Sequence, residues 1–469
     1  MKILLTGATG YIGKRLLQVL LSEQHEVVCL VRDINRFQSE LSSQLKVIEA
    51  DLLEKETLKS IPKDIDAAYY LVHSMSASDD YEDLEKQSAN NFKHAISMTD
   101  CKQVIYLGGI DNSATLSKHL NSRKTVETIL LQGKYQLTTL KAGIIIGSGS
   151  ASFEIIRDLV EKLPVMITPK WLNTKCQPIA ISDVIQYLIG VLLREEVYGK
   201  SYDIGGPDIL TYKEMLLGYA NARGVNRKII VMSFMTPKIS SYWLYFITST
   251  SYKLAVALVD SMKVEVVCQP NDLHKILNIT PKSYQVSLKR TLAAVKDNQV
   301  ISSWKDALIS SQFDERLSDY MEVPEYGCFK DQRSKKIRSL SHTIEKIWRI
   351  GGDNGWYAAN RLWKLRGFID KVFGGVGIRR GRTHPNIINI GDAIDFWRVL
   401  YANKSEGRLL LFAEMKLPGE AWLEFKIEDN MLIQTATLRP KGLRGRLYWY
   451  SVLPFHNLIF NKMLNSITS

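Results

Sequence analysis

In the first third of the chain, short apolar runs rich in β-branched residues alternate with longer segments whose apolar positions recur every three or four residues. The first pattern is typical of buried β-strands and the second of amphipathic helices. Repeated strand–helix units of this length favour an α/β fold, a doubly wound parallel sheet with helices on both faces. We expect strands at Lys2–Thr6, Glu26–Arg32, Leu45–Glu49, Ala67–Val72, Gln103–Leu107 and Gln136–Ile146, and helices at Tyr11–Ser22, Tyr81–Met98 and Leu116–Leu131.

From residue 151 to residue 330 the pattern contains fewer strands and more helix. We expect the first domain to cover residues 1–310, with a helical region from residue 207 to residue 310. A polar stretch, 311–337, follows and is predicted to be a connector because it contains turn-forming residues such as Pro324 and Gly327. The expected helices are Phe153–Leu163, Ile181–Leu193, Tyr212–Arg223 and Ser287–Val295.

The last part of the chain, 338–469, has a different pattern and is predicted to be an α+β domain. Alternating segments separated by turn residues indicate antiparallel strands at Ile387–Tyr401, Arg408–Lys416, Ala421–Glu428 and Met431–Arg439. The segment Arg338–Ile350 fits a strand or a helix. A closing helix is expected at Leu447–Leu464, bent by Pro454, with one face that lines a cavity, formed by Tyr448, Val452, Phe455, Leu458 and Phe460.

The net charge of the 469-residue chain is +12, and it is unevenly distributed. Residues 331–469 carry +11 and the first 330 residues carry +1. The densest basic runs, 374–382 and 439–446, are solvated loops, or they attract an acidic membrane surface or an anionic ligand. Nucleic acid is not an expected partner, because no recognised nucleic-acid-binding module accompanies the charge.

Five widely spaced cysteines contain no Cys-x-x-Cys pair, which argues against a zinc ribbon or a disulfide framework. We expect no metal site. The amino terminus lacks the apolar run of a secretory signal. The chain contains no stretch of eighteen uninterrupted apolar residues, so we expect no membrane span. The simplest compartment is therefore a reducing cytoplasm, with peripheral membrane contact through the basic tail left open.

Three glycines follow the first expected strand and open the first expected helix. Gly7 would allow the tight turn, Gly10 would let the backbone approach a pyrophosphate, and Gly13 would let helix and strand pack closely. The pyrophosphate would lie at the positive end of the helix dipole. A Gly-x-x-Gly-x-x-Gly motif in this strand–helix context predicts a dinucleotide-binding site in a Rossmann-type domain.

The segment from Thr6 through Thr9, Tyr11 and Ile12 to Gly13 resembles the extended and atypical short-chain dehydrogenase/reductases. The resemblance implies that these residues contact a nicotinamide cofactor. It also implies contacts from Asp51 and Leu52 after the third strand and from Leu71 and His73 after the fourth.

The end of the second expected strand bears on the choice of cofactor. Arg32 offers a forked cation to the 2′-phosphate of NADP, whereas Asp33 would bind the ribose hydroxyl of NAD. We favour NADP and keep NAD as the alternative.

Several further segments are similar to those of an NmrA-like, epimerase-like bacterial subgroup. They are residues 69–75, 106–110, 147–153 and 203–215, whereas 391–397 and 420–425 resemble the subgroup's C-terminal domain. That domain resembles a START/polyketide-cyclase-type helix-grip fold, which implies a cavity for a hydrophobic ligand. The helical region 207–310 would then contact the substrate.

The catalytic pattern of the resembled family is incomplete in this chain. Its members use a serine after the fifth strand and a Tyr-x-x-x-Lys on the next helix, whereas here the strand ends Tyr106-Leu-Gly-Gly-Ile110 and the helix has no tyrosine. His119 and Arg123, four residues apart on one helical face, are the replacement candidates. We therefore expect an atypical reductase or epimerase acting on an unidentified, apolar substrate. The alternative is a non-catalytic, NADP-responsive binding or regulatory protein.

Overall fold

The chain divides into two compact units, which are described separately below. A computed structural model describes residues 1–32, 34, 37, 43–72, 81–112, 117–148, 150–232, 256, 259–296, 323, 328–372, 377, 386–440 and 442–469. The first unit comprises Met1–Thr248 and Tyr252–Gln312, and the second comprises Ser249–Ser251 and Phe313–Ser469.

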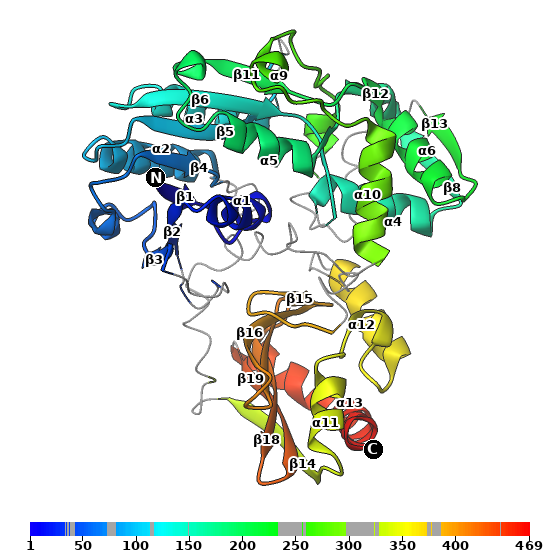
Figure 1. Cartoon of the computed structure of the whole chain (residues 1–469). Coiled ribbons are helices and arrows are strands. Elements are labelled where there is room, and N and C mark those ends of the chain that lie inside the picture. Colours follow the sequence, from blue (N-terminus) through cyan, green and yellow to red (C-terminus); the bar gives the residue numbers. More distant parts are fainter. Residues whose placement is uncertain are drawn as a thin grey trace. The chain divides into compact units, whose positions relative to one another are not determined.

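A seven-stranded parallel sheet forms the centre of the first unit (Figure 1). Its order is β11-β6-β5-β4-β1-β2-β3, and every pair of neighbours is parallel. The chain therefore winds outward in both directions from β1 and β4, which confirms the predicted doubly wound sheet. The strands are β1 Lys2–Thr6, β2 Glu26–Val31, β3 Leu45–Glu49, β4 Ala67–Tyr70, β5 Gln103–Gly109, β6 Gln136–Ala142 and β11 Ser201–Ile204.

Both faces of this sheet are covered by helices, because successive side chains of each strand point to opposite faces. Ile3 and Leu5 pack in one core with α1 Tyr11–Ser22 and α5 Ile181–Gly190, whereas Leu4 packs in a second core with α2 Tyr81–Ile96 and α3 Lys118–Leu130. Continuous burial on two sides explains why these strands read as unbroken apolar runs.

A second layer of the first unit is built mainly from helices around Phe153 and Tyr219, which are fully buried. The capping box of Thr211 and Glu214 marks the start of one of them. In its described part, the region beyond residue 207 contains two strands, β12 Leu210–Thr211 and β13 Lys228–Met232, besides its helices. The elements are α4 Ala151–Lys162, α6 Tyr212–Ala222, α9 Leu273–Ile276, α10 Tyr284–Lys296 and the strand pairs β7 Ile145–Ile146 with β10 Ile179–Ala180, β8 Val165–Pro169 with β13 Lys228–Met232, and β9 Lys175–Cys176 with β12 Leu210–Thr211.

The second unit contains a six-stranded antiparallel sheet in the order β14-β19-β18-β17-β16-β15, which confirms the predicted α+β class. One prediction was wrong: residues 329–336, assigned to the connector, form the edge strand β14. This strand was missed because its outward residues, such as Lys330 and Gln332, are exposed and give it a polar composition. The strands are β14 Phe329–Lys336, β15 Ala393–Ile394, β16 Trp397–Asn403, β17 Arg408–Ala413, β18 Gly419–Glu428 and β19 Met431–Pro440.

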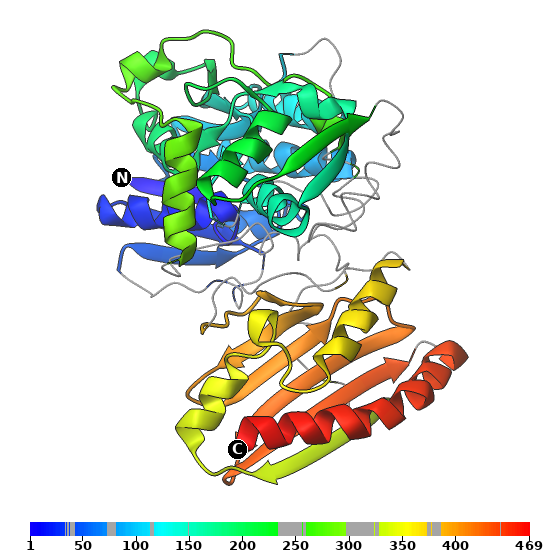
Figure 2. The same cartoon turned by 90° about the vertical axis from the view of Figure 1, so that its right-hand side faces the viewer.

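Three helices, α11 Leu340–Ile347, α12 Asn360–Val372 and α13 Gly442–Thr468, pack on one face of this sheet (Figure 2). The expected closing helix is present as α13, but the face predicted to point inward was wrong. Phe460 is buried as expected, but Phe455 and Leu458 are about half exposed, and Trp449 and Met463 take their place on the inward face. Both faces of this helix are apolar, so the helical period alone does not identify the inner one. Among the described residues no helix is long and apolar enough to cross a membrane.

Candidate functional site

Those predicted cofactor residues that the structure describes gather at the carboxyl ends of β1 to β4, where the chain order of the sheet reverses. Gly7 follows β1 with a φ of +70°, a conformation that residues with a side chain rarely adopt. A Cβ atom at Gly7 would lie 2.7 Å from the carbonyl oxygen of Leu71, directly after β4. The turn after β1 therefore packs against the end of β4. In doubly wound sheets, ligands bind at this kind of switch point.

The other two glycines have different structural reasons. A Cβ at Gly13 would lie 2.1 Å from the carbonyl oxygen of Gly7, so the first turn of α1 packs on the loop without room for a methyl group. At Gly10 the backbone is extended, and within the described part of the chain an added Cβ would approach only the carbonyl oxygen of Gly7, at 3.1 Å. Packing within the protein therefore does not require a glycine at position 10. The glycine leaves space open at the start of α1, which no side chain caps.

Other residues of the motif build the frame of this loop. The buried hydroxyl of Thr6 donates to the carbonyl of Tyr69 (2.9 Å) and accepts from the amide of Leu71 (3.2 Å), which ties β1 to β4. Tyr11 is buried beneath the guanidinium of Arg15, whose carbon lies 4.2 Å from the ring centre. Thr9 and Ile12 are half-buried beside them.

The ends of β2 and β3 supply the residues expected to read the adenosine part of a dinucleotide. Arg32 retains exposed surface, but partial desolvation lowers the pKa of its guanidinium, and the nearby Asp51 carboxylate opposes this effect. The carboxylate of Asp51 accepts the amide of Leu53 at 2.9 Å, and the carbonyl of the buried Leu52 accepts the side-chain amide of Asn91 at 2.7 Å. Both contacts hold the loop after β3 in place.

Asp33 and His73 lie outside the described residues, as does the side chain of His119, although its backbone belongs to α3. Arg123, four residues further along α3, donates to the carbonyl of Leu107 near the end of β5. Its guanidinium carbon lies 5.2 Å from the ring centre of Tyr106, and the Tyr106 hydroxyl donates to the Arg123 carbonyl at 3.1 Å. Burial raises the pKa of Tyr106 to about 12, so this phenol stays protonated near neutral pH.

A charged cluster at the carboxyl edge of β5 and β6 was missed in the sequence. Lys141 of β6 contacts Asp111 at 2.8 Å and Glu127 of α3 at 2.9 Å, and all three side chains are largely buried. Burial alone lowers the pKa of Lys141, but the two carboxylates outweigh this effect and raise it. The sequence could have indicated this cluster by position alone, because Asp111 follows β5 and Lys141 lies at the end of the neighbouring parallel strand β6.

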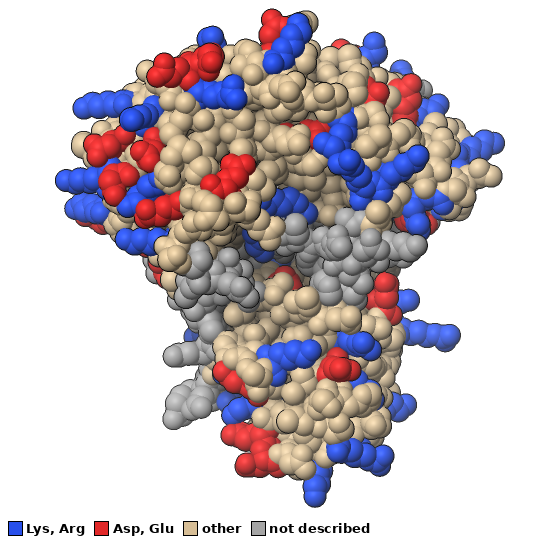
Figure 3. Space-filling view, in the orientation of Figure 1, with Lys and Arg blue, Asp and Glu red and all other residues tan. Residues whose placement is uncertain are grey.

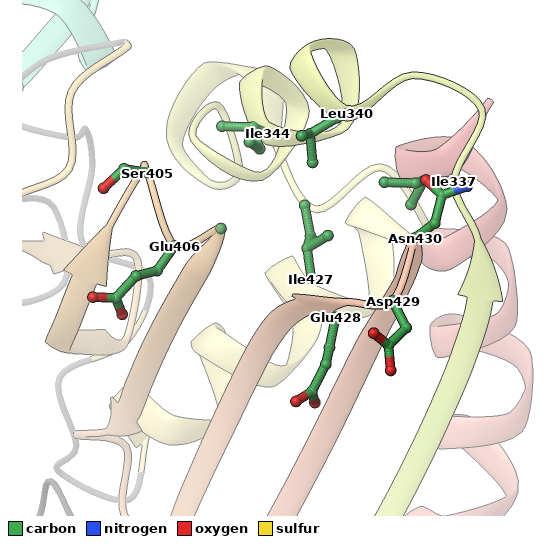
Figure 4. A pocket seen from close by; sticks show the side chains of 10 residues that line it. Ile337, Leu340, Ile344, Ser405, Glu406, Ile427, Glu428, Asp429 and Asn430 are labelled. Atoms are coloured by element: carbon green, nitrogen blue, oxygen red, sulfur yellow. The ribbon is translucent and has the colours of Figure 1, made fainter.

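The second unit contains a hollow of about 260 Å³ between α11 and the turns of two hairpins. Figure 4 shows Leu340 and Ile344 pointing from α11 toward Ile427, while the carboxylates of Glu406 and Glu428 point away from the apolar space. The hollow does not lie along the inner face of α13, where the expected cavity was predicted.

Two family models match separate parts of the chain. Residues 3–109 match the NAD dependent epimerase/dehydratase family, and residues 327–463 match a family described as protein of unknown function (DUF2867). One curated relative, equisetin synthetase eqxS from Fusarium heterosporum, is 29% identical over 106 residues. That match covers 20% of this chain and 3% of the relative's length.

Solved structures resemble the first unit. A nucleoside-diphosphate-sugar epimerase from Staphylococcus aureus is 16% identical, with a TM-score of 0.51, and the match covers 62% of this chain and 100% of that one. An NADPH-dependent quinone oxidoreductase from Escherichia coli, complexed with NADPH, is 16% identical, with 62% and 99% covered and a TM-score of 0.51. A triphenylmethane reductase from Citrobacter sp. is 17% identical, with 62% and 100% covered and a TM-score of 0.51. The first unit therefore has the fold of NAD(P)-dependent epimerases and reductases.

Proposed function

We propose that this chain is an NADP(H)-dependent oxidoreductase of the atypical short-chain dehydrogenase/reductase type, acting on an unidentified, apolar substrate. The observation that carries the proposal is the open space at Gly10. Gly7 and Gly13 are glycines because the protein's own backbone surrounds them, whereas among the described residues a Cβ at Gly10 would meet only one close neighbour, which supports a bound group beside it. A pyrophosphate placed there would meet the first-turn amides of α1.

Each strand end then has a proposed part in binding. The loop 7–13 holds the pyrophosphate, Arg32 binds the 2′-phosphate, and Leu71 lies beside the ribose. Arg32 suits this part because it is exposed and always charged, and Asp51 helps to orient it. If Asp33 binds a free ribose hydroxyl, NAD would be the cofactor instead. When bound, a nicotinamide cofactor supplies hydride transfer.

The proton for a reduction is assigned to His119, because α3 has no tyrosine. Arg123 would act as a positioning residue, since its guanidinium already donates to the carbonyl of Leu107. The cluster of Lys141, Asp111 and Glu127 fixes α3 against β6 at the same edge of the sheet.

The same observation on Arg123 favours a second candidate function, a non-catalytic NADP(H)-binding or regulatory protein. A guanidinium engaged with the protein backbone is less available to a cofactor ribose than the lysine of the resembled family. Calorimetric titration of the full chain with NADPH, followed by NADPH oxidation with a panel of quinones and carbonyl compounds, distinguishes the two. Binding with turnover that is lost in His119→Ala supports the oxidoreductase, whereas binding without any turnover supports the regulatory protein. No binding of NADPH or NADH contradicts both.

For the second unit we propose a START-like helix-grip domain that holds a hydrophobic ligand. An antiparallel sheet with a long C-terminal helix supports this, as does the hollow beneath α11, whose mixed lining includes the apolar side chains of Leu340, Ile344 and Ile427. A polarity-sensitive dye titrated into the full chain tests it. The expected signal is lost in Ile344→Asp, which places a charge in the hollow, and kept in Ile387→Asp, an exposed position elsewhere in the unit. A dye signal unchanged in Ile344→Asp would contradict the assignment.

A further inference from the structure

Two helices of the second unit carry large apolar side chains on the face that points away from the protein. Eight such side chains are between 41% and 63% exposed, although α12 and α13 make up less than a tenth of the chain. They are Leu365, Phe368, Ile369 and Val372 on α12, and Leu447, Tyr450, Phe455 and Leu458 on α13.

The spacing of these residues forms a continuous stripe along each helix. Leu365, Phe368 and Val372 follow one another at intervals of three and four residues, as neighbours on one helical face do. The opposite faces are committed to the core: Gly367 and Asp370 are buried in α12, and Trp449, Phe460 and Met463 are buried in α13. The outer stripes therefore have no packing role in the described part of this unit.

Both stripes lie on the same side of the second unit. Trp363 of α12 and Leu464 of α13 belong to the same core cluster as Leu423 of the sheet. The two helices thus cover one face of the sheet, and their outer faces point away from it together (Figure 2). Exposed apolar area of this kind marks an interaction surface.

The exposed charges on α12 and α13 themselves are of one sign. The exposed cations on the two helices are Arg361, Lys364, Arg444, Arg446 and Lys462. The sole acidic residue in either helix is Asp370, which is buried and accepts the amides of Gly377 (2.8 Å) and Lys416 (2.7 Å). Figure 3 shows both basic and acidic side chains on the second unit, so the single sign of charge is a property of these two helices.

We propose that α12 and α13 dock the second unit on an anionic lipid bilayer. The cations would pair with headgroup phosphates, and the two stripes would enter the boundary between headgroups and acyl chains. A second copy of the chain fits this face less well. A two-fold contact would bring the same cations of two copies together with no exposed acid on either helix to balance them.

The test is co-sedimentation of the full chain with vesicles of phosphatidylcholine alone or enriched in phosphatidylserine. We expect binding to the anionic vesicles only, weakened by salt. The double variant Phe368→Ser with Val372→Ser should weaken binding by about tenfold or more, as should Phe455→Ser with Leu458→Ser. The matched control is Ile167→Ser with Ile230→Ser, two exposed apolar residues on strands of the first unit. Melting curves of all variants verify that they fold.

Three results would overturn the proposal. One is the absence of binding to anionic vesicles, and another is binding that both helix variants retain. The third is a concentration-dependent dimer, seen by light scattering and abolished by the same variants, without vesicle binding. That result would assign the surface to a contact between copies.

Discussion

A methyl group added at Gly13 and, in a second variant, at Gly10 should separate folding from cofactor binding. In Gly13→Ala the new Cβ would lie 2.1 Å from the carbonyl oxygen of Gly7, 2.8 Å from its carbonyl carbon and 2.9 Å from the Cα of Ala8. All three are backbone atoms, so the contact is relieved only by moving the loop or the helix. We expect the free energy of unfolding of the first unit to fall by about 1–3 kcal/mol, the usual cost of overpacking.

Gly10→Ala should change the stability little and weaken cofactor binding strongly. The extended backbone accepts alanine, and the one close contact, 3.1 Å to the Gly7 carbonyl oxygen, needs a shift of a few tenths of an ångström. Loss of the glycine at the helix start costs about 1 kcal/mol or less. The methyl group would nevertheless occupy the space assigned to the pyrophosphate, so the dissociation constant for NADPH should rise by about tenfold or more.

Urea denaturation followed by circular dichroism measures the first effect, and calorimetric titration with NADPH measures the second. Wild-type stability in Gly13→Ala would show that the loop is not packed as described. Wild-type NADPH affinity in a folded Gly10→Ala protein would refute the assigned position of the pyrophosphate.

Three further outcomes are expected. Arg32→Ala should weaken NADPH binding by about 1.5–3 kcal/mol, the value of a lost charged hydrogen bond, and leave NADH binding nearly unchanged. Equal losses of affinity in calorimetric titrations with NADPH and with NADH would count against a 2′-phosphate contact. Burial lowers the pKa of His456 from its usual value of 6.5, although the Asp331 carboxylate lies 3.4 Å from the imidazole. The contribution of His456 to the stability of the second unit should therefore be constant above pH 6.5 and decline as the pH falls below 6.5. Melting curves from pH 7 to pH 5 should show a smaller decline in His456→Gln, and an identical decline would disprove the linkage. Arg398→Met should cost about 3–5 kcal/mol in urea denaturation, because it leaves the buried carboxylate of Glu414 without its 2.8 Å partner; a loss below 1 kcal/mol would show that the pair is not a structural requirement.

The parallel sheet was predictable because its strands are buried on both faces and therefore read as continuous apolar runs. The glycine turn was predictable for a similar reason, since a tight turn and a close helix restrict the residues at 7 and 13. Strand β14 was not recognised, because an edge strand with exposed outward residues has the composition of a loop.

The inner face of α13 was also not predictable, and the reason is physical. The helical period allowed Phe455 and Phe460 to share one face, but tertiary packing buries Phe460 and leaves Phe455 half exposed. The cluster of Lys141, Asp111 and Glu127 depends on contacts between β6, the end of β5 and α3. Spacing along the chain does not show such contacts until the strand order is known.

A crystal structure of the full chain grown with NADPH is the most direct test of the central claim. The account predicts the pyrophosphate against the start of α1, within about 3 Å of the amides of Ile12 and Gly13. It also predicts the 2′-phosphate beside Arg32. Density for NADPH at any other place on the molecule, with the space at Gly10 left empty, would contradict the account.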